Sequence, residues 1–199
     1  MLLGAARLAR VAERLRAAAP ASTTVDVLIQ TNGVLLTGAA LETLAGAGIR
    51  VGVSFDGDRM ATDRHRRYAS GRSSFEAVDR ALRRLRDRPE AFAGVLSAVD
   101  LHNDPVGTYE ALLAYRPPMV DFLLPHANWG SPPPGWVGGA TAPYGEWLVA
   151  AFDRWYGAPV RETRVRFFEE VLNLVLGGQS HTEVVGLSQR ALDMTLEYV

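Results

Sequence analysis

The chain has 199 residues and a mass of 21.6 kDa, a length that fits one domain with a full hydrophobic core. Hydrophobic residues make up 48% and charged residues 22%, which is the composition of a globular chain and argues against disorder. The net charge of -1 at pH 7 gives no electrostatic reason to expect a nucleic-acid partner.

The sequence contains no cysteine. Disulfides, thiolate nucleophiles, zinc sites with cysteine ligands and cysteine-held iron–sulfur clusters are therefore excluded within this chain. No apolar run reaches the ~20 residues of a membrane span, and the N-terminus has arginines where a signal peptide has its apolar core. These features predict a cytoplasmic protein that does not enter a membrane.

Helical and strand patterns alternate along the whole chain. In chain order they predict a helix over 5–19, a strand over 25–31, a helix over 37–45, a strand over 49–55, a helix from 73 to 88, a strand over 92–99, a helix from 105, a strand over 120–124, a helix from 143, and a strand over 164–168 followed by a helix ending at 177–178. This alternation with mostly short connections calls for a parallel sheet with helices packed outside it.

Several local signals sharpen these elements. The apolar face expected of the first helix consists of Ala5, Leu8, Val11, Ala12 and Leu15. Residues 25–31 are rich in strand-forming residues and carry a nearly continuous apolar run, which predicts a strand covered on both faces. Ser73 and Glu76 have the spacing of a capping box, and Asp104-Pro105 predicts an N-cap followed by a first-turn proline.

The fold class is α/β. Pattern alone does not separate an open doubly wound sheet from part of a (β/α) barrel, but no glycine-rich phosphate loop comes after the first strand. We therefore favour a partial parallel (β/α) barrel.

Polar residues, two of the groups with a glycine among them, come at the end of each of the first four predicted strands. They are Gln30, Thr31, Asn32 and Gly33 after the first, Ser54, Asp56 and Gly57 after the second, Asp100, His102, Asn103 and Asp104 after the third, and His126, Asn128 and Trp129 after the fourth. Each group has a structural explanation as turn or cap chemistry. Together, at the carboxyl ends of parallel strands, they predict a pocket for a polar ligand.

The segment 125–142 is long, rich in glycine and proline, and carries two tryptophans. These features predict a lid or a substrate-binding loop. We expect His126, Asn128 and Trp129, at its start, to contact the substrate.

The order and spacing of several motifs resemble the central part of radical SAM/SPASM peptide and protein maturases. The motifs are Gln30-Thr31-Asn32-Gly33, Val53-Ser54-Phe55-Asp56-Gly57, Asp63-Arg64-His65-Arg66, Gly71-Arg72-Ser73-Ser74-Phe75, Asn103-Asp104-Pro105, Asp121-Phe122-Leu123-Leu124-Pro125-His126 and Val165-Arg166-Phe167-Phe168-Glu169. The resemblance is greatest to the maturase type associated with FxSxx-COOH ribosomal peptides. It extends more distantly to the anaerobic sulfatase-maturating enzymes.

The resemblance implies an activity and two cofactors. In such enzymes a [4Fe-4S] cluster held by a CxxxCxxC loop reduces S-adenosylmethionine (AdoMet) to a 5′-deoxyadenosyl radical. This radical takes a hydrogen atom from a side chain of a ribosomal precursor peptide or protein.

The resemblance also implies roles for individual residues. Ser54 would hydrogen-bond the AdoMet ribose, and Arg66 would pair with the methionyl carboxylate. Thr31 and Asn32 would line the same pocket. Glu169 falls near the position where the sulfatase-maturating relatives have an aspartate proposed as general base, and a glutamate carboxylate can also accept a proton.

The chain departs from this family pattern because it has no cysteine, and so has neither the cluster-binding loop nor the auxiliary-cluster SPASM region. Residues 1–4 resemble the segment directly after the GGEP motif of the family. The resemblance thus implies one partial core domain, truncated at both ends, with barrel units at 1–124, a lid-like loop at 125–142 and a terminal strand–helix region at 143–199. Its first strand would lack a neighbour, and an unpaired edge invites association.

Three functions are consistent with these observations. The first is a radical SAM-type maturase whose chain as given cannot cleave AdoMet by itself. The second is a noncatalytic module that binds a precursor peptide or completes a partner polypeptide. The third is a barrel hydrolase that holds a metal with Asp56, His102, Asp104 and His126.

Overall fold

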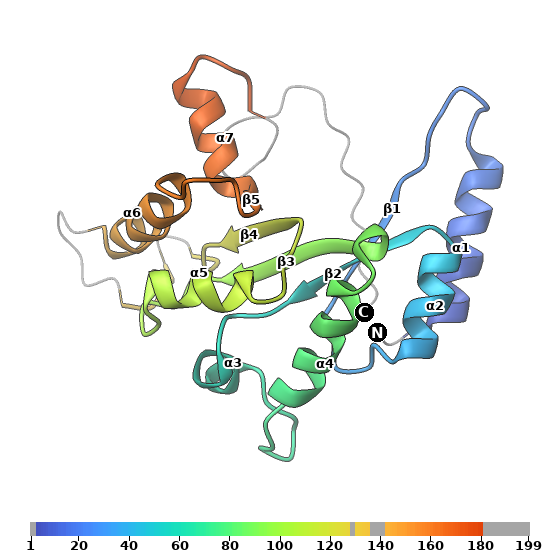
Figure 1. The fold of residues 1–199 in the computed structure, drawn as a ribbon, viewed down its shortest axis with the longest axis horizontal. Helices are drawn as coiled ribbons and strands as arrows, with labels where there is room; N and C mark the ends of the chain where they lie inside the picture. Colours follow the sequence, from blue (N-terminus) through green and yellow to red (C-terminus); the bar gives the residue numbers. More distant parts are fainter. Residues whose placement is uncertain (1–2, 128–129, 136–141, 181–199) are drawn as a thin grey trace.

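Five strands form one sheet in which every pairing is parallel. A computed structural model describes residues 3–127, 130–135 and 142–180. The strands, in both chain and sheet order, are β1 (Val27–Thr31), β2 (Ile49–Ser54), β3 (Phe92–Ala98), β4 (Met119–Leu123) and β5 (Arg164–Val165) (Figure 1). Because each strand pairs with the next one along the chain, the sheet has the sequential order of a partial parallel β/α barrel, and the α/β prediction is confirmed.

Helices fill the connections between the strands. They are α1 (Ala5–Ala18), α2 (Gly38–Gly46), α3 (Arg59–His65), α4 (Phe75–Arg86), α5 (Pro105–Leu113), α6 (Pro143–Tyr156) and α7 (Arg166–Val175), with a 3-10 turn at Pro89–Ala91 (Figure 1). The sequence pattern did not predict α3, a short helix whose N-cap side chain, Asp58, accepts a hydrogen bond from the backbone N of Ala61 at 2.9 Å. The fifth strand has two residues instead of five, because the chain enters α7 at residue 166.

The predicted capping box does not form. The N-cap of α4 is Ser74, and its side chain does not cap the helix; its hydroxyl donates to the backbone O of Arg66 at 2.5 Å. Ser73 donates to Asp63 at 2.6 Å, and Glu76 pairs with Arg59. Both members of the predicted box are therefore engaged by side chains of α3, which local sequence spacing does not reveal.

One face of the sheet is packed against helices. Alternate residues of β2 to β4 enter this core because side chains of a strand point to opposite faces in turn. The core includes, from strands and helices, Val51, Val53, Phe55, Val95, Val120, Phe122, Leu44, Leu82, Tyr109 and Leu112. Arg16 of α1 fastens its helix to this layer by donating to the backbone oxygens of Ala47 at 2.5 Å and Gly48 at 2.9 Å.

The other face of the sheet is open over β1. Leu28 is 49% exposed, and Gln30 is also exposed, whereas Thr31 is buried against the helical side. The prediction of a strand covered on both faces was therefore wrong. We call this side, which carries Leu28, Gln30, Ser54 and Asp121, the open face.

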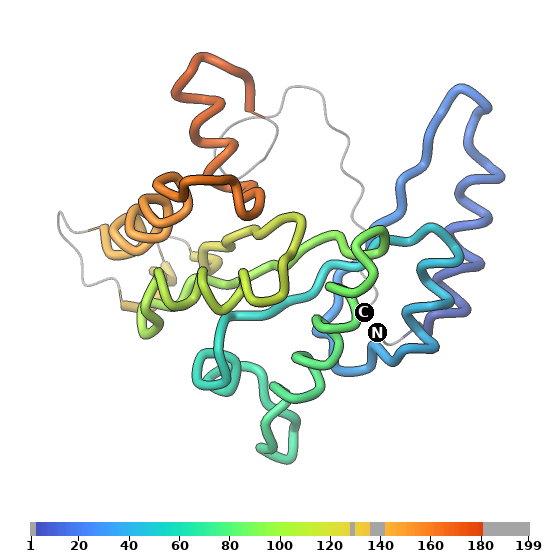
Figure 2. The backbone as a smooth tube through the Cα atoms, viewed as in Figure 1, coloured from blue at the N-terminus to red at the C-terminus, as the bar shows by residue number. Residues whose placement is uncertain are grey.

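The β1 side of the molecule has a second apolar surface, on α1. Figure 1 shows α1 at the right edge of the molecule, beside α2, and Figure 2 shows residues 19–26 extending beyond α1 before β1 begins. Ala12 is buried, but Val11 is 43% and Leu15 46% exposed, so only part of the predicted apolar face contacts the domain. No helix among the described residues is long and apolar enough to cross a membrane.

Candidate functional site

The register of the sheet brings Gln30 and Ser54 together on the open face. Gln30 pairs with Gly52 across β1 and β2, and its Nε2 donates to Ser54 Oγ at 3.2 Å. A Cβ on Gly52 would lie 2.1 Å from Gln30 Oε1, so the glycine leaves the space that this amide occupies. An amide and a hydroxyl therefore stand side by side near the carboxyl ends of two neighbouring strands.

Thr31 and Asn32, the other residues expected in this pocket, serve the turn after β1. Thr31 is 6% exposed and its Oγ1 accepts from the backbone N of Gly33 at 3.3 Å. Asn32 is exposed and its Oδ1 accepts from the backbone N of Val34 at 3.2 Å. These are the contacts of an ST turn and an Asx turn, with Gly33 at a φ of 76°, and neither residue bonds to Ser54.

Asp56 and Arg66 form a bidentate ion pair just beyond β2. Arg66 donates from Nε at 2.5 Å and from Nη2 at 3.0 Å to the two carboxylate oxygens. Asp56 Oδ1 also accepts from the backbone N of Ala98 at 3.1 Å, which ties the pair to the end of β3. The carboxylate is 5% exposed and the guanidinium side chain 27%, so the pair is mostly removed from water.

A cavity of about 460 Å³ opens beside this pair, at the carboxyl ends of β2, β3 and β4. We call it the edge cavity. Its lining residues are Asp56, His65, Arg66, Ala98, Val99, Asp100, His102, Pro125, Pro134 and Tyr144. Ion-pairing groups and imidazoles thus share one cavity with aliphatic walls, a mixture that suits a ligand with both charged and apolar parts.

Asp100 joins three side chains at the rim of the edge cavity. Its Oδ2 lies 2.9 Å from Arg64 Nε and 3.1 Å from His65 Nε2, and its Oδ1 lies 2.8 Å from His102 Nδ1. Burial alone would raise the pKa of the Asp100 carboxyl, but hydrogen bonds from His102 and His65 and the charge of Arg64 lower that pKa below its ordinary value. The carboxylate therefore stays ionised at neutral pH.

The lowered pKa of Asp100 predicts a contribution to acid sensitivity. A carboxyl whose pKa is lower in the folded state stabilises the fold above its unfolded pKa of about 3.9, and this contribution disappears as the pH falls through the folded value. We expect the free energy of unfolding of the parent chain to fall more than that of Asp100→Asn between about pH 5 and pH 3. Urea unfolding of both chains at the two pH values measures this difference, and equal losses of unfolding free energy in the two chains would contradict the prediction.

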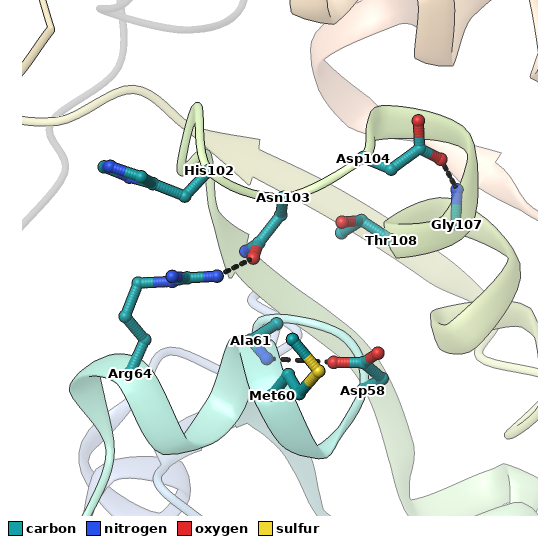
Figure 3. A pocket seen from close by; sticks show the side chains of 9 residues that line it. All are labelled: Asp58, Met60, Ala61, Arg64, His102, Asn103, Asp104, Gly107 and Thr108. Atoms are coloured by element: carbon teal, nitrogen blue, oxygen red, sulfur yellow. Dashed lines mark hydrogen bonds between the residues drawn. The ribbon is translucent and has the colours of Figure 1, made fainter.

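A second, smaller cavity of about 180 Å³ lies between α3 and α5 (Figure 3). Arg64 of α3 donates from Nη2 to Asn103 Oδ1 at 3.0 Å, which joins the two sides. Asp104 caps α5 by accepting from the backbone N of Gly107 at 2.6 Å, as its position before Pro105 predicted. His102 lines both this cavity and the edge cavity.

The open face holds a third cavity, of about 300 Å³. Two glycines, Gly52 and Gly94, are partners in the register of β2 and β3, so neither strand contributes a side chain of its own at this level of the open face. Arg166 at the start of α7 donates to Asp121 from Nε at 2.9 Å, and its Nη2 bonds to the same oxygen. This ion pair closes the β4 end of the cavity.

Glu169 lies in α7 and is engaged by two nearby arginines. Its carboxylate pairs with Arg164 Nη2 at 2.7 Å and also with Arg161. It is not among the residues that line the edge cavity or the open-face cavity. The role of Glu169 as a general base stays a prediction.

The remaining predicted site residues are only partly described. His126 is exposed after β4, whereas Asn128 and Trp129 lie outside the described residues. Asp56 is committed to Arg66 and Asp104 to the α5 N-terminus. Among residues 3–127, 130–135 and 142–180, no group of three or more acidic or histidine side chains could hold a metal ion, which leaves the hydrolase hypothesis without a metal centre in that part of the chain.

Two features of the site were not among the predicted site residues. Gln30 was recognised only as one of several polar residues after β1, although its alternation with Leu28 and its register opposite β2 put it on the open face. Asp100 was recognised in the same way. Its contacts with His65 and Arg64 come from α3, an element that the sequence pattern had not predicted.

Comparison with known proteins identifies the fold. No protein-family model matches this sequence, and no curated protein matches it significantly. Among solved structures, native anSMEcpe with bound AdoMet and the Kp18Cys peptide matches with a TM-score of 0.78 at 21% identity, over 91% of this chain and 51% of that chain. Native anSMEcpe with bound AdoMet matches with a TM-score of 0.72 at 20% identity, over 88% of this chain and 49% of that chain.

These neighbours are anaerobic sulfatase-maturating enzymes of the radical SAM type. This chain spans about half the length of the solved structures it matches. At this identity the likeness concerns the fold, and it agrees with the sequential parallel sheet described above: this chain has the fold of a partial parallel β/α barrel, similar to the barrel of these neighbours.

Proposed function

We propose that this chain is the AdoMet-binding part of a radical SAM-type peptide maturase. The observation that carries the proposal is the carboxyl edge of the parallel sheet, where Ser54 stands beside Gln30 on the open face and Arg66 lies beside Asp56 at the edge cavity. The likeness in fold to AdoMet-bound structures supports it. This chain spans about half the length of those structures. The activity of a complete maturase is therefore proposed here and is not shown by the likeness in fold.

The residues present fit AdoMet. Ser54 Oγ accepts from Gln30, so its own O–H is free to donate to a ribose hydroxyl, and Gln30 Oε1 can accept from one. Arg66 has five N–H donors, of which two are directed at Asp56, and the others are available for the methionyl carboxylate. The aliphatic walls formed by Ala98 and Val99 suit an adenine ring.

The residues present do not fit an iron–sulfur cluster. Such clusters are held mainly by cysteine thiolates, and this chain has no cysteine. We therefore assign the [4Fe-4S] cluster, and with it the hydrogen-atom abstraction, to polypeptide outside these 199 residues. A complementing polypeptide at the β1 edge is consistent with this assignment, because no described strand pairs with the outer edge of β1.

The proposed substrate is a ribosomal precursor peptide or a protein segment. Two of the structural neighbours contain bound peptide. We assign contacts with the peptide to His126, Asn128 and Trp129. These residues belong to the proposed lid-like loop 125–142, which would connect the barrel units at 1–124 to a terminal region at 143–199. His126 comes after β4, at the same edge of the sheet as the edge cavity.

Calorimetric titration of this chain with AdoMet tests the proposal. We expect measurable binding, and we expect Ser54→Ala to weaken it about fivefold to tenfold, because one hydrogen bond contributes ~1 kcal/mol. Ser97→Ala is the matched control, since Ser97 lies on the helical side of β3, fully buried and with an unpartnered hydroxyl, and its loss should leave the affinity unchanged.

Two results would overturn the assignment. Absence of AdoMet binding by the parent chain would remove the proposed ligand. Equal AdoMet affinity of the Ser54→Ala variant and the parent chain would mean that Ser54 does not contact AdoMet.

A further inference from the structure

Asp100 fixes the ring of His102 at the rim of the edge cavity. Asp100 Oδ1 accepts from the backbone N of His102 at 2.9 Å and lies 2.8 Å from Nδ1 of the same residue. The carboxylate is 13% exposed and is also bound by Arg64 and His65 through its other oxygen. Both carboxylate oxygens are thus occupied, and the carboxylate is held from three sides.

This geometry defines which ring nitrogen carries hydrogen. An ionised carboxylate can only accept hydrogen bonds, so the nitrogen that faces it must be an N–H. In a neutral His102 ring the hydrogen is therefore on Nδ1, and Nε2 keeps a free lone pair. His65 faces Asp100 through Nε2 and so has the opposite arrangement, with a bare Nδ1.

The turn that carries His102 is anchored on both sides. Trp147 Nε1 donates to the backbone O of Asn103 at 2.9 Å, Leu101 packs against the core, and Asp104 caps α5. The His102 ring points away from Asn103 and Asp104 in Figure 3. Its side chain is 73% exposed, and none of the described residues hydrogen-bonds to Nε2, so the bare nitrogen is open to a ligand.

We propose that His102 accepts a proton from a peptide bound at the rim of the edge cavity, with Asp100 as its positioning residue. The group that it would deprotonate is a side-chain thiol or hydroxyl. The S–H or O–H bond breaks, its electron pair stays on sulfur or oxygen, and the proton adds to the lone pair of Nε2. The Asp100 carboxylate beside Nδ1–H then stabilises the imidazolium.

The other charged groups around the edge cavity do not compete for this role. Asp56 is paired with Arg66, and both of its carboxylate oxygens are engaged in that pair. Arg64 is bound to Asp100 and Asn103. The inference rests on the proposed function for the identity of the ligand, but the hydrogen-bond geometry of His102 is independent of it.

Nitrogen-15 NMR of the histidine rings, at a pH where they are neutral, tests the geometry. We expect His102 to carry its hydrogen on Nδ1 and His65 to carry it on Nε2. In Asp100→Ala we expect His102 to shift toward the Nε2–H form that histidine favours in water, while His65 keeps its form. A parent chain in which His102 carries hydrogen on Nε2 overturns the proposal, whatever the AdoMet titration gives.

Proton acceptance is measured with a short cysteine-containing peptide as the probe. Because this chain has no cysteine, alkylation by iodoacetamide reports on the peptide thiol alone. With peptide binding measured separately by fluorescence anisotropy, we expect the bound thiol to be alkylated at least about tenfold faster than the free one. His102→Gln should abolish this gain, and Asp26→Ala, at a residue that does not line the edge cavity, should retain it. The role of His102 is overturned if the bound thiol is alkylated no faster than the free thiol, or if the bound thiol is alkylated equally fast in His102→Gln.

Discussion

Replacing Asp56 with alanine is expected to lower the free energy of unfolding by ~3 kcal/mol. Removing one partner of a buried ion pair leaves the other charge without compensation, at a cost of about 3–5 kcal/mol, and the 27% exposure of Arg66 puts this site at the lower end. The variant also removes the acceptor of the Ala98 N–H, which joins β2 to β3. Urea unfolding followed by circular dichroism measures the change.

The exposed pair between Asp26 and Arg50 is the matched control. It joins the same types of side chain, with exposed fractions of 60% and 44%, where an ion pair contributes less than ~1 kcal/mol. Asp26→Ala should therefore leave the unfolding midpoint nearly unchanged. Asp56→Asn keeps an acceptor for Ala98 and should fall between the two. Equal effects of Asp56→Ala and Asp26→Ala would mean that the Asp56–Arg66 pair does not hold the sheet edge together.

This result bears on function because the same pair shapes the edge cavity. Among the described residues the Arg66 guanidinium hydrogen-bonds only to Asp56, so this carboxylate sets the orientation of the guanidinium toward the proposed carboxylate site. A chain that folds in Asp56→Asn but binds AdoMet more weakly would identify Asp56 as a positioning residue for Arg66.

Sequence periodicity predicted most of the elements and the parallel sheet, for a physical reason. When apolar strands alternate with short amphipathic helices, few arrangements bury the apolar surfaces of the strands and of the helices, and a parallel sheet covered by helices is one of them. The sheet edge could be predicted as well, because polar residues after parallel strands converge at one edge. The pattern thus placed Ser54 at this edge, whereas the interest in Arg66, and the proposed contacts of both residues with AdoMet, came from the family resemblance.

The features that the sequence did not predict depend on contacts between distant segments. The side chains that face Asp100 come from α3 and from the turn after β3, 35 residues apart in the case of His65. Gln30 meets Ser54 through strand register, which a single strand does not specify. Leu28 is apolar but exposed. The apolar composition of β1 predicted that both of its faces are buried, whereas the alternation of its side chains and its position at the edge of the sheet leave one face exposed.

The positions of two glycines at the centre of the open face lead to the second large effect: Gly94→Ala should destabilise the fold by ~3 kcal/mol. Gly94 has a φ of 144°, a conformation that costs a side-chain-bearing residue about 1–3 kcal/mol. A Cβ there would lie 2.4 Å from the backbone O of Met119 in β4, so the two central strands would have to separate, and overpacking of this kind costs a further ~1–3 kcal/mol. Thermal unfolding should show a fall in Tm of roughly 6–12 °C.

Gly52→Ala is the control because it adds the same methyl group in the neighbouring strand. Its Cβ would meet Gln30 Oε1 at 2.1 Å, the far end of a flexible side chain that can rotate away. We therefore expect a change in stability of less than ~1 kcal/mol together with weaker AdoMet binding, since Gln30 would leave Ser54. If Gly94→Ala proved as stable as the parent chain, the close approach of β3 to β4, and with it the open-face cavity between them, would be wrong.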